Sequence, residues 1–171
     1  MTEKEMFLNS YEREFEITLK FLKAYPMEKL DFRPYPNAQS AKELAWSFAE
    51  EERALISGSL GGDIVFKQDI VPETFDDIKT IYERNHHLFA EKIGNLSDDA
   101  FNEMVTFGAD SDNAVAPMRR GDVLWLALMD GAHHRGQFSV YIRMVGGKTP
   151  PSYNKNSSDS EFFIYARNKI S

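Results

Sequence analysis

The stretch Val123–Gly146 constrains the fold of this chain more than any other part of the sequence. It is the most apolar run, and its apolar residues recur at the spacing of one helix face: Ala127, Gly131, Phe138, Tyr141 and Val145. Asp130 and His134 fall on the same stripe, one helical turn apart. An inward carboxylate and an inward imidazole are costly to bury unless a hydrogen-bond network or a metal ion satisfies them. The stretch therefore predicts a long helix with a polar site at its middle.

Composition narrows the class of protein. The 171 residues are predicted to form a single domain, residues 1–171, long enough to bury a core without disulfides. The chain has no cysteine, which excludes thiolate metal sites and a thiol nucleophile. Its net charge of −7 argues against nucleic acid and against an anionic membrane surface as partners. There is no signal-peptide pattern, and the longest uncharged apolar run, Val123–Met129, is too short to span a bilayer, so we expect a cytoplasmic protein.

Helical patterns dominate the rest of the chain and predict an all-α four-helix bundle. Capping boxes at Thr2–Glu5 and Ser40–Glu43 mark the starts of the first two helices. The first helix is expected to end at Pro26, and the second to run from Ala41 to about Ile56. The third is expected to run from Phe75 to Ile93, and the fourth to begin near residues 118–122 and end at Gly146. The links between the second and third helices and between the third and fourth are long enough to be crossover connections.

Three segments fall outside these helices. Residues 95–117 form a long irregular stretch, with Phe101, Met104, Val105 and Phe107 as expected anchors. Residues 64–72 are expected to be a loop with some extended character. The tail Asp159–Ile170 predicts a short C-terminal extra element, read as a fifth helix with a strand as the alternative.

Two stretches carry a family resemblance. Asp31–Glu52, DFRPYPNAQSAKELAWSFAEEE, and Leu128–Tyr153, LMDGAHHRGQFSVYIRMVGGKTPPSY, resemble the Arg-Pro loop with its capped helix and the HHRGQ signature of the DinB-like superfamily, which includes the YfiT-type proteins. The resemblance implies a four-helix bundle, a homodimer, and one divalent metal, often nickel or zinc, held by three histidines. Relatives of this type include thiol S-transferases and isomerases that use low-molecular-weight thiols.

The metal positions depart from the family pattern. Ser47 and Asp130 stand where the resemblance implies histidines, and His134 alone matches. Glu51 lies one turn beyond Ser47 and is a candidate third ligand, which would give a set that favours iron, manganese or zinc. Alternatively, His134 hydrogen-bonds to Asp130 within the helix and no metal is held.

Neighbouring polar residues are expected to have structural roles. His133 lies about 100° from the stripe and is expected to bond to a backbone carbonyl or water. Arg135 is expected to pair with acids of a neighbouring helix, and Gln137 is expected to be structural or to line the site. His86 and His87 are expected to be exposed.

Several bulky residues suggest further contacts. Trp46 and Trp125 lie off the main stripes and are expected to bury against the tail or a second subunit. The last helix has a second apolar face with Trp125, Leu128 and Met129, which supports a homodimer. The acidic run Glu50–Glu52 is expected to be a solvated face, with Glu51 as the exception.

The sequence therefore leaves two functions open. One is a divalent-metal-dependent enzyme of the thiol S-transferase type acting on a small molecule, with His134, Asp130, Glu51 and Ser47 as the candidate site. The other is a metal-free member that binds a small molecule or acts through its dimer surface. No nucleotide-binding glycine loop or serine–histidine–acid pattern identifies catalytic residues.

Overall fold

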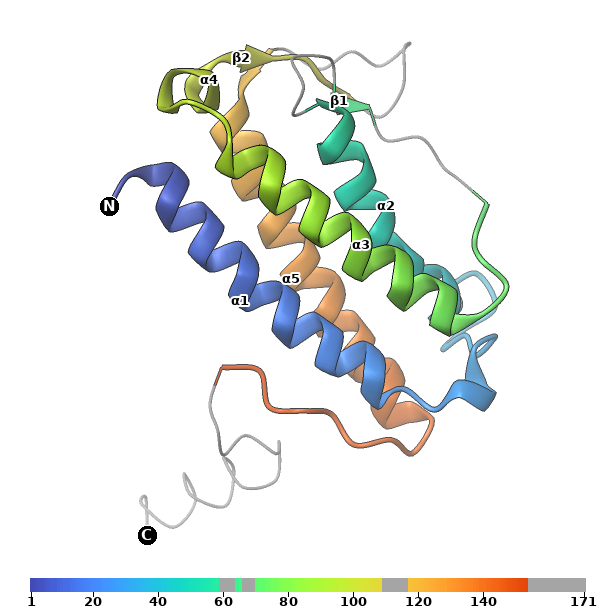
Figure 1. Ribbon diagram of the computed structural model, residues 1–171. Coiled ribbons are helices and arrows are strands. Elements are labelled where there is room, and N and C mark those ends of the chain that lie inside the picture. The colour runs from blue at the N-terminus through green and yellow to red at the C-terminus, as the bar shows by residue number, and fades with distance from the viewer. Residues whose placement is uncertain (59–63, 66–69, 109–116, 154–171) are drawn as a thin grey trace, which may run out of the picture.

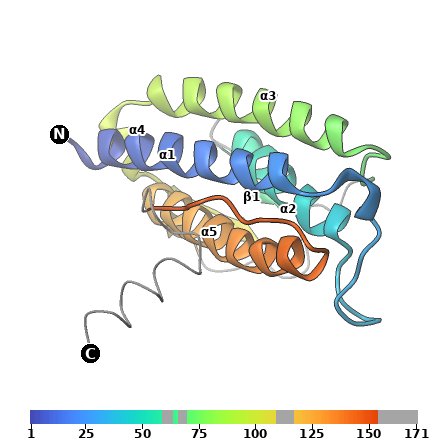
Figure 2. The same cartoon turned by 90° about the horizontal axis from the view of Figure 1, so that it is seen from below.

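Four long helices packed side by side form the fold (Figures 1 and 2). The structure is a computed structural model that describes residues 1–58, 64–65, 70–108 and 117–153. Its elements are α1 (Glu3–Ala24), a 3₁₀ turn η1 (Met27–Lys29), α2 (Ala41–Gly58), β1 (Ile64–Val65), α3 (Phe75–Gly94), α4 (Asp98–Asn102), β2 (Met104–Val105), β3 (Phe107–Gly108), β4 (Met118–Arg119) and α5 (Arg120–Met144). The predicted all-α bundle is confirmed.

The helices are not arranged in chain order around the bundle. α1 packs against α3 and α5, and α2 packs against the same two helices, so α1 lies diagonally opposite α2. Figure 1 shows that α1 and α5 run in one direction, whereas α2 and α3 run in the other. Because α2 and α3 are parallel neighbours, the link between them must return along the bundle, as its length predicted.

Side-chain caps set where the helices begin. Thr2 Oγ1 accepts from the Glu5 amide while the Glu5 carboxylate accepts from the Thr2 amide, and Ser40 and Glu43 repeat this arrangement at the start of α2. Thr74 caps α3 by accepting from the amide of Asp77. Each cap satisfies amides that have no partner within the helix. The helix starts predicted from the two capping boxes, and the predicted start of the third helix at Phe75, are therefore confirmed.

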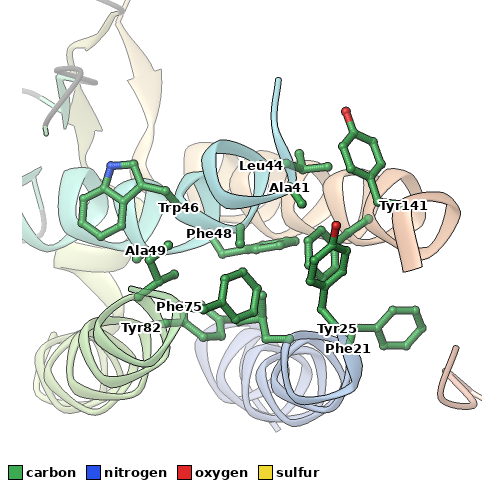
Figure 3. Close-up of a cluster of buried hydrophobic side chains, with 14 of the residues drawn as sticks. Phe21, Tyr25, Ala41, Leu44, Trp46, Phe48, Ala49, Phe75, Tyr82 and Tyr141 are labelled. Atoms are coloured by element: carbon green, nitrogen blue, oxygen red, sulfur yellow. The ribbon is translucent and has the colours of Figure 1, made fainter. Parts of the chain in front are cut away.

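An aromatic core fills the space between the helices (Figure 3). Leu44 and Phe48 face inward from α2, and Phe138 of α5 stacks against Phe75 of α3. Trp46 is also buried in this core, so it covers the chain's own interior. The expectation that Trp46 needs the tail or a second subunit was therefore wrong. Trp125 packs edge-on against Phe7 and stays partly exposed, so its expected contact with the tail or a second subunit stays a prediction.

The stretch expected to be irregular, 95–117, contains defined elements. Ser97 caps the short helix α4, β2 pairs antiparallel with β4, and β3 pairs in parallel with β1. Phe101 and Val105 are buried anchors as expected, but Met104 is exposed because β2 points it outward.

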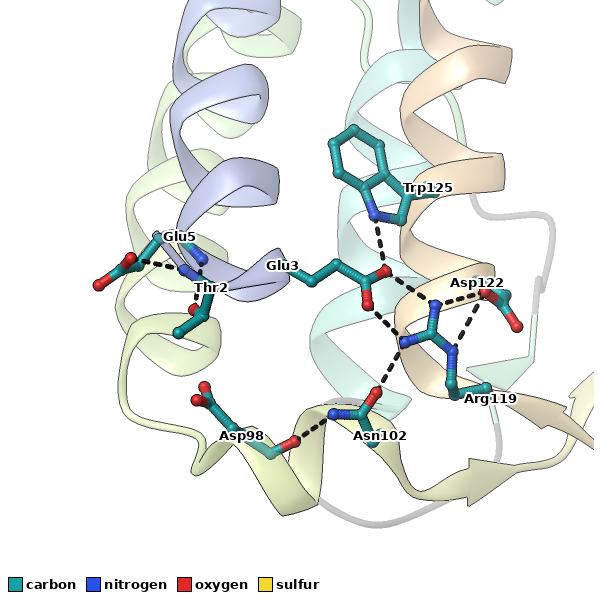
Figure 4. Close-up of polar contacts among 8 residues, drawn as sticks. All are labelled: Thr2, Glu3, Glu5, Asp98, Asn102, Arg119, Asp122 and Trp125. Carbon is teal, nitrogen blue, oxygen red and sulfur yellow. Dashed lines mark hydrogen bonds and ion pairs between the residues drawn. The ribbon is translucent and has the colours of Figure 1, made fainter.

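A polar network fastens this region to the start of α1 (Figure 4). Arg119 donates to Glu3, to Asp122 and to Asn102, and Trp125 Nε1 donates to Glu3 Oε1 at 3.2 Å. A planar guanidinium that serves several acceptors holds the end of the bundle in one arrangement.

Some expectations fall on residues outside the described ranges. The predicted C-terminal element, Asp159–Ile170, lies there, as does part of the link between α2 and α3. Among the described helices, none is long and apolar enough to cross a membrane.

Candidate metal centre

The packing of α2 against α5 brings together three residues predicted from the sequence. Glu51 comes from α2, and Asp130 and His134 come from successive turns of α5. One ligand atom from each residue lies within 4.8 Å of the other two. The one-turn spacing places Asp130 and His134 on one face of α5, and helix packing then supplies Glu51 from the opposite side.

The nearest partner of His134 lies on the other helix. Its Nδ1 is 2.9 Å from Oε1 of Glu51 and 3.9 Å from Oδ2 of Asp130. The expected alternative, a hydrogen bond from His134 to Asp130 within α5, is therefore not what the structure contains. The contact with Glu51 is close but poorly directed, and within the described part of the chain this buried nitrogen has no hydrogen-bond partner.

Electrostatics suit this cluster to binding a cation. Glu51 is 15 % exposed and His134 22 %, whereas Asp130 is 58 % exposed. Burial raises the pKa of Glu51, and contact with the Glu51 carboxylate raises the pKa of His134. Ionised Glu51 therefore needs a positive charge beside it. Protonated His134 can supply that charge, and so can a divalent cation.

Ser47, the fourth candidate ligand, hydrogen-bonds to the backbone of its own helix. Its hydroxyl donates to the backbone carbonyl of Glu43, one turn back along α2, at 3.3 Å. It lines a cavity that it shares with Arg33 and Trp46, rather than either cavity lined by Glu51. Its role as a metal ligand stays a prediction.

Two cavities meet at Glu51. A small internal cavity of about 40 Å³ lies on one side, and Glu52 and Arg135 also contribute to its walls. On the other side lies a larger cavity of about 570 Å³, lined by Glu51 together with Asp130 and His133. We call this larger space the outer cavity. The two candidate carboxylate ligands, Glu51 and Asp130, are thus accessible to a small molecule in the outer cavity.

The remaining residues of the HHRGQ signature have structural contacts. Arg135 is buried and donates to Glu14 of α1 at 2.6 Å and to Tyr153 at 2.7 Å, which confirms the predicted pairing with a neighbouring helix. His133 and Gln137 lie side by side, with their Nε2 atoms 2.9 Å apart. His133 therefore contacts a side chain rather than the expected backbone carbonyl or water.

A second histidine–carboxylate cluster lies in the core, where neither residue was expected. Tyr11 donates to Oε1 of Glu52 at 2.5 Å, and His86 lies between Glu52 and Glu12. The His86 ring stacks on Phe15 with their centroids 3.5 Å apart. Both His86 and Glu52 are buried, so the expectation that these two residues are exposed was wrong.

Helical spacing could have revealed this second cluster. His86 lies one turn after Tyr82 and one turn before Phe89, both buried. Glu52 similarly lies between Phe48 and Leu55 on the inner face of α2. The ionisable character of these residues masked their position on apolar stripes.

Comparisons with known proteins identify the family and the fold of this chain. The DinB family model matches residues 1–168. A DinB-like protein from Bacillus cereus ATCC 10987 is 25 % identical, with a TM-score of 0.72 over 87 % of this chain and 97 % of that one. No protein with a curated description matches the sequence.

Two further structures share the fold at lower identity. YfiT from Bacillus subtilis, described as a probable metal-dependent hydrolase with an unusual four-helix bundle topology, is 11 % identical, with a TM-score of 0.65 over 84 % of this chain and 87 % of that one. A mycothiol-dependent maleylpyruvate isomerase is 12 % identical, with a TM-score of 0.63 over 79 % of this chain and 60 % of that one.

Proposed function

Because this chain belongs to the DinB family, we propose that it is a metal-dependent enzyme that holds one divalent cation between α2 and α5. The supporting observation is the convergence of Glu51, Asp130 and His134 around a buried imidazole nitrogen that has no hydrogen-bond partner among the described residues. Structural neighbours that include a probable metal-dependent hydrolase and a thiol-dependent isomerase support the same class.

The three residues fit a borderline or hard cation. One imidazole and two carboxylates favour iron, manganese or zinc over the nickel often held by three histidines. Glu51 and His134 are the more buried ligands and would hold the ion. Asp130 is more exposed and would close the site on the side of the outer cavity. Ser47 remains a secondary candidate, since its hydroxyl would have to leave the Glu43 carbonyl.

The chemistry proposed is activation of a thiol or water toward a small-molecule substrate. A divalent cation supplies Lewis acidity and lowers the pKa of a bound thiol or water. Glu51 and Asp130 would balance the charge of the ion, and the packing of α2 on α5 would fix their positions. The reaction class is thiol transfer, isomerisation or hydrolysis, as in the fold's thiol-dependent and hydrolytic relatives.

A metal-free binding protein is the second candidate. Ser47 and Asp130 replace expected histidines, and the contact between Glu51 and His134 gives the buried carboxylate a positive partner when the imidazole is protonated. In this candidate, the same pocket binds a small molecule without a metal ion.

Metal titration separates these candidates. Protein purified without a nickel column is titrated with zinc, manganese and nickel by calorimetry, alongside His134→Ala and, as a matched control, His133→Ala. We expect one equivalent to bind wild type, at least about 100-fold weaker binding to His134→Ala, and a change below about threefold for His133→Ala. A tenth of an equivalent or less in wild type, with no rise in melting temperature, would reject the metal enzyme.

A gain-of-function variant tests the metal-free candidate directly. Ser47→His combined with Asp130→His restores the histidines that the family pattern implies. If only this double variant binds a divalent ion, the parent is a metal-free member. If the parent binds as tightly as the double variant, the metal-free candidate fails.

A homodimer with a cytoplasmic location remains part of the proposal. α5 exposes Val140 and Met144, one turn apart and outside the outer cavity, which offer an apolar surface to a second copy. Sedimentation equilibrium would test the dimer, and a monomer at micromolar concentration would contradict it.

A further inference from the structure

The outer cavity joins an apolar wall to the candidate metal ligands. Phe107 of β3 and Leu126, Ala127 and Met129 of α5 line it together with Glu51, Asp130 and His133. Its volume of about 570 Å³ lies within the range of small-molecule pockets. Apolar walls with a few convergent polar groups are typical of such pockets.

The apolar wall and the candidate metal ligands are adjacent because α5 carries residues of both. Leu126 and Asp130 are one turn apart on α5, and Met129 directly precedes Asp130, so the apolar side chains border the acid. Glu51 also lines the internal cavity, so it lies in the wall between the two cavities. A molecule in the outer cavity can therefore touch the apolar wall and the two candidate carboxylate ligands together.

The charge of the walls restricts what can bind. Two carboxylates with one divalent cation sum to zero, so the loaded site keeps no excess positive charge. Among the described residues that line the outer cavity there is no lysine or arginine. Phosphorylated and other polyanionic substrates therefore lack the partners that they need.

We propose that the substrate is a small molecule with an apolar body and one uncharged or singly charged metal-binding head. This inference rests on the proposed function. The body lies on Phe107, Leu126 and Met129, and the head lies beside Glu51 and Asp130, where these carboxylates of the candidate metal centre line the cavity. The apolar wall acts in specificity and contributes affinity in proportion to the apolar surface that it covers.

A small molecule fits this cavity better than a partner chain does. Leu126 is 44 % exposed and Met129 59 % exposed, so both are open to an incoming ligand. A protein surface laid over them would also take Asp130 and Glu51 out of water, and desolvating two carboxylates is costly. A single metal-binding head removes that cost because it approaches the acids through the cation.

Chain length provides the test. The zinc-loaded protein is titrated by calorimetry with straight-chain hydroxamic acids, from acetohydroxamic to octanohydroxamic acid. We expect Kd to fall about threefold for each added methylene as the chain extends along the apolar wall. In Met129→Gln and in Leu126→Gln, Kd should depend less steeply on chain length. Met144→Gln, a matched control at an exposed position of α5 outside the outer cavity, should leave that dependence unchanged.

A parallel series separates failure of this inference from failure of the proposed function. Straight-chain alcohols are titrated into the metal-free chain, where the same dependence on length is expected without any ion. If zinc does not bind but the affinity of the alcohols rises with chain length, the proposed function fails, whereas the inference that the apolar wall binds the body of a small molecule is supported. If zinc and acetohydroxamic acid bind but both series are flat, the inference about the substrate is overturned. A flat series together with loss of a dimer in Met129→Gln also overturns it, because this face is then an interface between copies.

Discussion

Two adjacent glutamates on α2 each meet a histidine, yet they build different environments. Glu51 faces α5 and lies 2.9 Å from Nδ1 of His134, beside the outer cavity. Glu52 faces the core and lies 3.9 Å from Nδ1 of His86, a residue with no exposed surface. One residue of helical rotation, about 100°, separates an accessible cluster from a sealed one.

The two clusters also differ in how their carboxylates approach the imidazole. At His134, Glu51 and Asp130 both approach Nδ1, so three donor atoms converge on one point. At His86, Glu12 contacts Nε2 while Glu52 lies near Nδ1, on the other side of the ring. One ion cannot bind both nitrogens of a ring, so His86, Glu12 and Glu52 cannot converge on a single ion. Convergence and access, rather than residue type, distinguish a candidate metal centre from a structural network.

The largest expected effect is a difference in folding stability between the two histidines. His86→Ala should lower the free energy of unfolding by about 3 kcal/mol, because it leaves a cavity beside Phe15 and Tyr11. His134→Ala should cost less than about 1 kcal/mol in metal-free buffer, since this residue is partly exposed. Urea denaturation followed by circular dichroism measures both values. Equal losses would show that the two clusters are equally structural.

A smaller effect should appear in the pH dependence of the glutamates. Burial raises the pKa of Glu52 well above its ordinary value, although the hydrogen bond from Tyr11 opposes this. A raised pKa contributes stability that is complete below the unfolded pKa of about 4.5 and is lost as pH rises through the folded pKa. Wild type should therefore lose stability as pH rises from 5 to 9, whereas Glu52→Gln, which has no ionisable group at this position, should not lose that contribution.

Glu51→Gln is the matched comparison for this measurement. Protonated His134 partly offsets the burial of Glu51. The stability that Glu51→Gln gains relative to wild type over the same pH range should therefore be smaller than the stability that Glu52→Gln gains. Urea titrations in chelator-treated buffer at pH 5 and pH 9 give the free energy of unfolding of each variant relative to wild type. A larger gain for Glu51→Gln than for Glu52→Gln would reverse the assignment of the sealed and accessible clusters.

The smallest expected effect tests the space beside the candidate metal centre. A Cβ at Gly131 would lie 3.7 Å from Oε2 of Glu51, an ordinary contact, and a Cβ at Gly136 would meet nothing within 4 Å. Both positions lie inside α5, where alanine is a better helix former than glycine. Gly131→Ala and Gly136→Ala should each raise stability by about 0.5–1 kcal/mol. Thermal denaturation would show crowding at Glu51 if Gly131→Ala alone destabilised the protein.

Much of the fold could be predicted because its signals are local. Thr2 and Ser40 cap the helices that follow them, and the apolar spacing of α5 correctly places Phe138 and Tyr141 on a buried face. Capping depends on amides within three residues of the cap, and periodicity depends on the geometry of one helix. The pairing of Asp130 with His134 on one face of α5 follows from the same geometry.

The three-dimensional packing decided what those faces meet. It placed Glu51 against His134, sealed Glu52 and His86 beneath Tyr11 and Phe15, and ordered elements within a stretch that looked irregular. Burial and electrostatic partners depend on residues far apart in the chain, so no local pattern reports them. The sequence alone determined the helices, their caps and the face that carries His134, whereas only the tertiary structure decided which carboxylates converge on it and which cavity those carboxylates line.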